Sequence, residues 1–596
     1  MEHSRAFAEN CERLFQPRFG RRWKKAAASF LGVGRTSLYR YLKGELRVPE
    51  EIAARLAVLA RDPPKGTKEA PFFAAGGHTS GGLKMLPEEK ITDPLRPFTG
   101  AEYIDSLRDG REVYIDGERV ADVTTHPAFR NSVRSIARLY DALHDPRTRP
   151  LLTVPTDTGS GGYTHRFFRA AHSREELLAQ RQAIAEWARL SYGWMGRTPD
   201  YKASLMNTLG ANADYYGQFA GNARAWYRRV QEAVLFMNHA IVNPPVDRGR
   251  PTSEIKDVYV TIERETGAGV VVSGAKVVAT SAALTHYNFL GQNAATATSD
   301  PDLAIMFILP MDAPGVKLIC RNSYEEIATR LGTPFDYPLS SRFDENDAIF
   351  ILDKVLIPWE NVLVHRDTEK ILSFYPRSGF LNGFCFQGCT RFAVKLDFIA
   401  GLVARALRAA GGDEFRGNQA LLGEIVAWRN LFWSLSECMA ASPQPWVGEA
   451  VLPNLQAALS YRVFAPDAYS RIREIIEKIV ASSLIYLPSS ARDFQNPAID
   501  PYLERYVRGS YGIGYKERIK IMKLLWDAVG TEFGGRHELY ERNYAGNHED
   551  IRIQTLTAAK RSGSLEEMTA LVDRCMADYD EKGWVAEAWR DGAPAS

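Results

Sequence analysis

Residues 192–248 read YGWMGRTPDYKASLMNTLGANADYYGQFAGNARAWYRRVQEAVLFMNHAIVNPPVDR, and within them a helical sequence pattern gives way to a β-type pattern. Near the start, Thr198 followed by Pro199 predicts a helix N-terminus, because proline fixes φ at the helical value and its missing N–H is not needed there. Arg197 then precedes the helix and Tyr201 lies in its first turn. A guanidinium, a phenol hydroxyl and a helix dipole favour anion binding, although an ordinary capped helix with a surface arginine fits the same residues.

Three sequence patterns follow one another along the chain. Residues 96–235 carry helical periodicity, clearest at 175–192, where apolar residues recur three and four apart. After His239, short β-branched runs bounded by Gly, Pro and Asp predict a small all-β domain over about 240–365. From Leu381 onward the long helical pattern predicts a helical bundle. The β runs are 258–262, 269–273, 275–278, 304–309 and 348–352, and the clearest bundle helices are 391–410, 418–442 and 465–483.

The size and composition of the chain indicate an ordinary multidomain globular protein. With 596 residues, 45% of them apolar and 24% charged, the chain is too long for one hydrophobic core and predicts roughly three or four domains. The formal net charge of +2 gives no general affinity for nucleic acid or membrane. No N-terminal apolar segment and no run of 18 apolar residues occurs, so we expect a cytoplasmic protein that does not enter the membrane.

The cysteines, histidines and glycines exclude several kinds of site. Six cysteines are scattered, and the C-x3-C pair of Cys385 and Cys389 lacks the second cluster that a zinc site needs, so no metal is expected. The eleven histidines include no H-E-x-x-H motif. Gly267 and Gly269 run into a Val-rich strand without a following helix, which is neither a Rossmann turn nor a P-loop. A nucleotide cofactor would need another architecture.

The first 62 residues differ from the rest in charge, with 13 Lys/Arg against 7 Asp/Glu, a local +6. Residues 20–44 resemble a helix-turn-helix: Ala28 allows close helix approach, Gly32 makes the corner, and the second helix carries outward polar residues. This pattern predicts DNA binding through residues 20–44 or a plain interaction module. The outward residues are Arg35, Thr36, Ser37, Tyr39, Arg40 and Lys43. Residues 63–93, rich in Gly, Pro and Thr, predict a linker, and Met85 within it is an alternative start of translation.

Nine longer segments together resemble one enzyme family. The segments are RPFTGAEYIDSLRDGREVYIDGERVADVTTHPAF from Arg96, TDTGSGGYTHRFF from Thr156, YGWMGRTPDYKA from Tyr192, NHAIVNPPVDR from Asn238, VSGAKVVATSAALTHYN from Val272, YPLSSRFDENDAI from Tyr337, LIPWENVL from Leu356, LIYLPSSARD from Leu484 and EFGGRHELYE from Glu532. They are similar to the oxygenase components of 4-hydroxyphenylacetate 3-monooxygenases, which are two-component FAD-dependent aromatic hydroxylases. The resemblance covers about residues 90–590 and leaves the first 84 without a counterpart.

The resemblance implies a fold and an oligomer. The family has an acyl-CoA dehydrogenase-like α+β multidomain fold, with an N-terminal helical domain, a middle β-barrel and a C-terminal four-helix bundle. Mapped onto this chain, these domains are 94–238, 239–367 and 368–596, preceded by the helix-turn-helix-like segment 1–62 and the linker 63–93. A homo-oligomer, either a dimer or a tetramer, is also implied.

The resemblance implies a reaction as well. A separate NAD(P)H-dependent flavin reductase would supply reduced FAD, which reacts with O2 to a flavin hydroperoxide. This intermediate would then hydroxylate a para-substituted phenol at the ortho carbon, which deprotonation of the phenol enriches in electron density. The implied substrate is 4-hydroxyphenylacetate, giving 3,4-dihydroxyphenylacetate, and another 4-substituted phenol is the alternative.

The family motifs also assign site residues. Arg197, Tyr201 and His239 fall on the positions that surround the substrate hydroxyl, where they would stabilise, hydrogen-bond and orient or deprotonate it. The loop that follows Thr285 would cover the substrate tail, with Gln292 and Asn293 as candidate contacts. The flavin positions are His239, Ala240, Ile241, Pro245, Val246, Asp247, Arg248, Thr280, Gly534, Gly535, Arg536 and His537, of which the last four lie in a bundle segment expected to reach flavin from a neighbouring subunit.

Three alternatives remain open at this stage: a structural role for the site residues, a different reaction and a different class of protein. A histidine at a helical-to-β junction, such as His239, is more often a structural residue than a base, and Gly534-Gly535 fits a helix break. A related branch with this flavin site dehydrates 4-hydroxybutyryl-CoA with an iron–sulfur cluster, which the scattered cysteines disfavour. A transcription regulator that senses a phenol and binds DNA through residues 20–44 is the third alternative.

Overall fold

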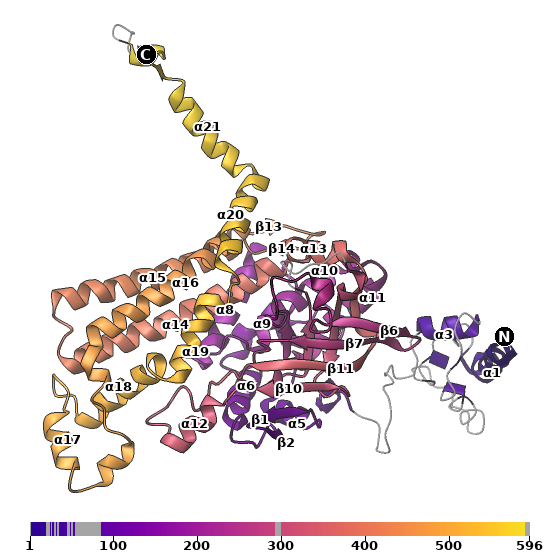
Figure 1. Ribbon diagram of the computed structural model, residues 1–596, viewed down its shortest axis with the longest axis horizontal. Coiled ribbons are helices and arrows are strands. Elements are labelled where there is room, and N and C mark those ends of the chain that lie inside the picture. Colours follow the sequence, from indigo (N-terminus) through magenta and orange to yellow (C-terminus); the bar gives the residue numbers. More distant parts are fainter. Residues whose placement is uncertain are drawn as a thin grey trace.

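The computed structural model describes residues 2–19, 35–43, 85–292 and 300–590, with isolated positions 24, 27, 28, 31, 48, 52, 53 and 56. Two β-sheets and the first helical region form the centre of the molecule, and long helices form a bundle on one side of them (Figure 1). The N-terminal helices α1 and α3 lie on the opposite side, and helix α21 projects away from the body (Figure 1). The predicted order of helical, β and helical regions is confirmed.

The first region is mainly helical because its apolar residues recur at helical spacing. Helix α8 (Arg174–Leu190) covers the predicted 175–192; Ser173 caps it by accepting from Glu176 N–H, and Leu177, Ile184 and Trp187 are buried on one face. The other helices are α5 (Gly100–Ser106), α6 (Arg130–Ala142), α7 (Arg149–Leu152), α9 (Pro199–Met206), α10 (Thr208–Ala211) and α11 (Ala220–Ala233).

This region also contains strands that the helical prediction for 96–235 missed. Strands β1 (Val113–Ile115) and β2 (Glu118–Val120) form a hairpin, and β1 pairs in parallel with β10 of the middle region. Strands β3 (Thr153–Pro155) and β4 (Tyr163–His165) form a second hairpin. Three-residue strands are too short for a period-2 pattern to be visible, so the sequence could not reveal them.

The middle region consists of two sheets among the described residues. One has the strand order β2-β1-β10-β11-β7-β6 and the other β12-β9-β8-β5. The predicted runs at 269–273, 304–309 and 348–352 lie largely within strands, whereas Val258 precedes its strand and helix α12 (Tyr324–Leu331) interrupts the all-β prediction. The strands are β5 (Met237–Ala240), β6 (Thr261–Thr266), β7 (Gly269–Lys276), β8 (Tyr287–Leu290), β9 (Ile305–Pro310), β10 (Val316–Cys320), β11 (Ala348–Pro358) and β12 (Val362–His365).

The C-terminal bundle contains helices α14 (Phe380–Ala410), α15 (Arg416–Ala441) and α16 (Leu455–Val480), with α18 (Tyr515–Val529) and α19 (Glu532–Asn543) beside them. Helix α14 begins earlier than the predicted 391–410. Its glycines allow close packing there: a Cβ on Gly383 would lie 2.5 Å from Ser204 O on α9. Gly383 therefore brings the bundle against the helix that carries Tyr201. The remaining helices are α13 (Thr368–Arg377), α17 (Asp500–Tyr506), α20 (His548–Ser562) and α21 (Ser564–Met576).

The two ends of the chain extend from this body. Helices α1 (Glu2–Phe19) and α3 (Arg35–Leu42) enclose a small core that includes Phe15, Leu38 and Tyr41 and is separate from the main core. The predicted corner at Gly32 and the linker residues 63–84 lie outside the described residues. None of the helices in the described part of the chain is long and apolar enough to cross a bilayer.

Candidate active site

Arg197 and Tyr201 stand at the start of α9, as the sequence predicts. Thr198 is the N-cap residue and Pro199 the first helical residue, although the Thr198 hydroxyl donates to Asp200 Oδ1 instead of capping a backbone N–H. Tyr201 is buried and Arg197 half-buried. The short first turn therefore holds both side chains between the first helical region and the bundle.

The Arg197 guanidinium lies among three tyrosine rings. Its Cζ is 4.0 Å from the ring centroid of Tyr201, 4.9 Å from that of Tyr544 and 5.5 Å from that of Tyr540. Its Nη1 is buried and has no hydrogen-bond partner among the residues that the structure describes. A cation over aromatic faces is stabilised, but an unsatisfied buried N–H is costly, so this group can donate to a ligand acceptor.

His239 joins them from strand β5. Its ring centroid is 5.5 Å from that of Tyr201 and 6.2 Å from that of Phe380, and within the described part of the chain its Nδ1 has no hydrogen-bond partner. Burial, with the nearby charges of Lys202 and Arg197, holds the pKa of His239 well below its usual value. The imidazole is therefore neutral near pH 7 and offers one acceptor and one donor nitrogen.

Together these side chains form a largely buried cluster that is cationic and aromatic, the candidate substrate pocket. Burial raises the pKa of Tyr201, although the Arg197 guanidinium opposes that rise, so the phenol stays protonated and can donate a hydrogen bond. Arg197 and His239 each have a buried nitrogen without a partner among the described atoms. Such an arrangement suits an oxygen atom that bears or acquires negative charge.

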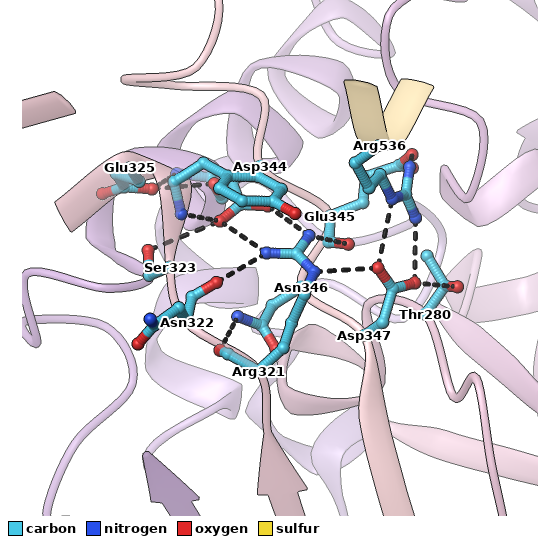
Figure 2. Close-up of polar contacts among 12 residues, drawn as sticks. Thr280, Arg321, Asn322, Ser323, Glu325, Asp344, Glu345, Asn346, Asp347 and Arg536 are labelled. Atoms are coloured by element: carbon cyan, nitrogen blue, oxygen red, sulfur yellow. Dashed lines mark hydrogen bonds and ion pairs between the residues drawn. The ribbon is translucent and has the colours of Figure 1, made fainter. Parts of the chain in front are cut away.

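A cluster of buried carboxylates lies beside the pocket, and the sequence reasoning assigned it no role. Figure 2 shows Asp347 between the guanidinium groups of Arg321 and Arg536. Arg536 donates from Nε (3.1 Å) and Nη2 (2.9 Å), Arg321 from Nε (3.0 Å), and the Thr280 hydroxyl also donates to Asp347. These donors hold the pKa of Asp347 well below its usual value against the effect of burial. Asp347 thereby fixes two predicted flavin residues, Thr280 and Arg536.

Glu345 connects this cluster to the pocket. Its Oε1 accepts from the backbone N–H of Arg197, and its Oε2 lies 3.5 Å from Arg536 Nη1. A chain of contacts thus runs from the start of α9 through Glu345 and Arg536 to Asp347. The sequence does contain a signal for this cluster: the run Asp344-Glu345-Asn346-Asp347 places three carboxylates directly before a β-branched strand. Acidic residues next to a buried strand need partners, because such side chains are seldom buried unpaired.

The start of α19 carries the other predicted flavin residues, and the alternative of a helix break at Gly534-Gly535 is wrong. Thr531 caps this helix by accepting from Gly534 N–H, and a Cβ on Gly535 would meet nothing within 4 Å. His537 points inward, with its ring centroid 5.0 Å from that of Trp194 and its Nδ1 3.4 Å from Lys395 Nζ. Arg536, not His537, faces the cluster in Figure 2, and it does so from within the same chain.

The predicted flavin loop lies at the end of β5. Ala240 and Ile241 are buried, and Pro245, Val246, Asp247 and Arg248 are exposed. The two residues predicted to contact the substrate tail are Gln292 and Asn293. The Gln292 amide is already hydrogen-bonded to Lys276 Nζ and Leu303 O, and Asn293 lies outside the described residues.

A helical region, two sheets and a helical bundle arranged around this pocket define an enzyme of the acyl-CoA dehydrogenase-like fold class. Two family models match the chain: 4-hydroxyphenylacetate 3-hydroxylase N terminal over residues 99–364, and 4-hydroxyphenylacetate 3-hydroxylase C terminal over 371–573. The chain therefore belongs to the 4-hydroxyphenylacetate 3-hydroxylase family, which confirms the resemblance seen in the sequence.

Individual relatives agree with this membership. The chain is 60% identical over 501 residues to a 4-hydroxyphenylacetate 3-monooxygenase oxygenase component of Pseudomonas aeruginosa, covering 84% of this chain and 96% of the relative. A protein of the same description from Escherichia coli is 59% identical, with the same coverage of both chains. A crystal structure of an oxygenase component of 4-hydroxyphenylacetate 3-monooxygenase, complexed with FAD and 4-hydroxyphenylacetate, superposes with a TM-score of 0.75 at 34% identity and covers 80% of this chain and 99% of that one.

Proposed function

We propose that this chain is the oxygenase component of a two-component, FAD-dependent monooxygenase that hydroxylates 4-hydroxyphenylacetate at the carbon ortho to its hydroxyl group. The product is 3,4-dihydroxyphenylacetate. The observation that carries the proposal is the meeting of Arg197, Tyr201 and His239 in one buried pocket, with nitrogens that lack partners among the described residues. Relatives 59–60% identical over nearly their whole length support the choice of substrate.

Each pocket residue has a chemical role toward the phenol. Arg197 stabilises the charge that develops on the phenol oxygen when the proton leaves. Tyr201, kept protonated by burial, donates a hydrogen bond to that oxygen. His239, neutral because of its lowered pKa, orients the oxygen through a ring nitrogen without carrying charge itself. The aromatic walls exclude water from the reaction.

The residues that we propose for the flavin fit such a cofactor on two observations. Gly535 opens the start of α19 to close approach, and Arg536 presents a buried Nη1 without a hydrogen-bond partner in the described ranges. When bound, reduced FAD activates O2 and delivers an electrophilic oxygen to the ring. We assign His239, Ala240 and Ile241, the exposed loop Pro245, Val246, Asp247 and Arg248, together with Thr280, Gly534, Gly535, Arg536 and His537, to holding it.

The proposed partners are a flavin reductase that uses NAD(P)H and further copies of this chain. Helix α21 projects from the body (Figure 1). It supports the oligomer, because it exposes Leu571, which is 62% exposed, and Val572, which is 55% exposed. An apolar face of this kind is covered in a dimer or tetramer. Light scattering tests it: Leu571→Glu combined with Val572→Glu should lower the molar mass, and an unchanged mass contradicts this role of α21.

Reconstitution tests the activity. The purified chain is supplied with FAD, NADH, O2 and a generic flavin reductase, and a panel of para-substituted phenols is analysed for catechol products. We expect the fastest catechol formation from 4-hydroxyphenylacetate, and none when the reductase is omitted. A faster reaction with another 4-substituted phenol would change the substrate only. If chemically reduced FAD gives no catechol from any phenol of the panel, the proposal fails.

The N-terminal segment supports a second candidate function, DNA binding through residues 20–44. Tyr39 and Arg40 of α3 and Lys43 directly after it are exposed, while Leu38 and Tyr41 are buried in the separate small core. The Ser37 hydroxyl, however, donates to Gly267 O in the turn between β6 and β7 (3.0 Å), which directs one predicted groove-reading residue toward the body. A gel-shift assay with the promoter of its own operon, repeated after deletion of residues 1–84, tests this: equal binding by both proteins excludes it.

A further inference from the structure

Lys202, the residue after Tyr201, is buried without an evident structural reason. Its side chain has an exposed fraction of 0%. Its Nζ has no hydrogen-bond partner among the residues that the structure describes. Burying an ammonium group costs several kcal/mol unless it is paired and hydrogen-bonded. The fold therefore retains a costly amine that it does not use for its own stability.

Other buried lysines of this chain are partnered. Lys276 donates to Ile241 O, Asn243 Oδ1 and Gln292 Oε1. Lys395 pairs with Glu541, and Lys523 with Asp336. In these three cases an oxygen of the protein satisfies the amine. Lys202 differs, since among the described residues its Nζ lies over aromatic rings and has no hydrogen-bond partner, so a ligand oxygen is the partner that is missing.

The amine of Lys202 reaches the same pocket as His239. Its Nζ lies 4.2 Å from the ring centroid of Phe380 and 5.2 Å from that of Tyr201, and both rings also flank His239. A third ring, that of Phe289, is 5.8 Å from Nζ, and Phe289 is paired with His239 in the ladder between β5 and β8. Three elements thus enclose the amine beside the imidazole.

We propose that Lys202 is a further catalytic residue, whose amine accepts the proton of the phenol that binds between Arg197, Tyr201 and His239. The O–H bond of the phenol breaks, its electron pair stays on the oxygen, and a new N–H bond forms with the lone pair of Nζ. The resulting ammonium faces the phenolate and is stabilised by the ring of Phe380. This inference rests on the proposed function, since it requires a phenol in the pocket.

The electrostatics of the pocket agree with this role. Burial, followed by the charge of Arg197, holds the pKa of Lys202 well below its usual value, which favours the neutral form whose lone pair accepts a proton. The titratable or charged groups that face it are Arg197 and Tyr201 from α9 and His239 from β5. The same environment makes His239 a weak base, because its pKa is also lowered strongly.

A coloured phenol tests the proposal without turnover. 4-Nitrophenol, which is yellow when ionised, is bound to the full chain saturated with oxidised FAD, and its ionisation in the site is followed against pH by difference spectroscopy. In the wild-type protein we expect ionisation below the pKa of free 4-nitrophenol. Lys202→Met should move the midpoint upward by at least about one pH unit, a tenfold change in the ionisation equilibrium. Lys523→Met, a buried lysine far along the chain in α18, should leave the midpoint unchanged.

An equal midpoint in the wild-type and Lys202→Met proteins overturns the proposal. Proton release, measured with an indicator dye in weak buffer, provides a second test that needs no variant and so remains valid if Lys202→Met does not fold. Binding of 4-nitrophenol as phenolate should release no proton to the solvent, because the amine retains it. Release of about one proton for each phenolate bound also overturns the proposal. If the wild-type protein hydroxylates phenols and yet gives either of these two contradicting results, the role proposed for Lys202 is wrong while the proposed function stands.

Discussion

Two groups of ionisable side chains lie close together in this molecule, and they differ in whether the protein itself supplies a partner of opposite charge. In the bundle, Glu541 of α19 accepts from Arg391 Nη2 and Lys395 Nζ of α14, each at 2.9 Å, and the three side chains are at most 2% exposed. In the pocket, the half-buried guanidinium of Arg197 and the buried amine of Lys202 have no carboxylate bonded to their nitrogens among the described residues. The two groups are connected by a short loop, since Gly193 O accepts from Arg391 Nη1 at 3.4 Å.

The difference separates structural charges from functional ones. A buried ion cluster that is complete in the protein holds two helices together and needs no ligand. Basic groups left without an anion are costly to the folded state, and a ligand that brings negative charge or a proton to them removes that cost. The bundle cluster should therefore determine stability, and the pocket cations should determine reactivity. Four predictions test this division, from the largest expected effect to the smallest.

Glu541→Gln should destabilise the protein most. It leaves Arg391 and Lys395 buried without a compensating charge, and removal of one partner from a buried ion pair costs about 3–5 kcal/mol. The free energy of unfolding from urea titration measures this loss. Glu538→Gln on the same helix is the matched control, because Glu538 pairs with Arg473 at a half-buried surface site and should cost about 1 kcal/mol or less. Equal losses for both variants would contradict a structural role for the cluster.

Arg197→Met should have the opposite profile. Hydroxylation should slow by about 10²–10³-fold, the usual effect of removing one donor to a developing oxyanion. The free energy of unfolding should fall by less than about 1 kcal/mol, since the variant loses only the contacts to the tyrosine rings and removes an unpaired buried charge. Arg405→Met, at an exposed ion pair with Glu517, controls for the loss of an arginine and should change neither quantity. A large stability loss in Arg197→Met would make this guanidinium structural.

The order of the three regions and the start of α9 were predictable from the sequence. Helical and β periodicity gave the order of the three regions, and the pair Thr198-Pro199 gave the start of α9, because these signals depend only on neighbouring residues. The resemblance to the family then selected Arg197, Tyr201 and His239, which the structure brings together from α9 and β5. Whether they contact substrate stays a prediction.

Contacts between residues far apart in the sequence could not be predicted. Strand β1 enters the sheet by pairing with β10, about 200 residues later, and no local pattern encodes that partner. Asp347 acquires its importance from Arg536, 189 residues away in the sequence, and Glu345 from Arg197. Lys202 was overlooked for the converse reason: a lysine is notable only once its burial and the absence of a partner in the described structure are known.

Lys276 is an intermediate case and gives a pH-dependent prediction. It is buried and bonded only to neutral oxygens, and burial lowers its pKa to about 7. Between pH 7 and about 10.4, the ordinary value for lysine, the unfolded chain holds a proton that the folded protein does not, so raising the pH favours the folded state. The unfolding free energy of the wild-type protein relative to Lys276→Met should rise by about 1 kcal/mol per pH unit across this window. A difference that is flat with pH would place the Lys276 pKa near its ordinary value.

Deletion of residues 1–84 should have the smallest effect, and it tests whether the pocket cations really lack a partner within the chain. A carboxylate from that segment could in principle neutralise them. In the described part of the segment, however, the side chains pack around a separate core, and the Ser37 hydroxyl donates a hydrogen bond to Gly267 O of the body. We expect kcat/KM for hydroxylation to change by about twofold or less, the range typical of surface changes. Ser37→Ala in the full chain is the control for that single bond. A strong activation on deletion, absent in Ser37→Ala, would mean that the segment supplies an anion to the pocket. The bundle cluster and the pocket would then both have a partner within the chain, and they would differ only in whether substrate can replace that partner.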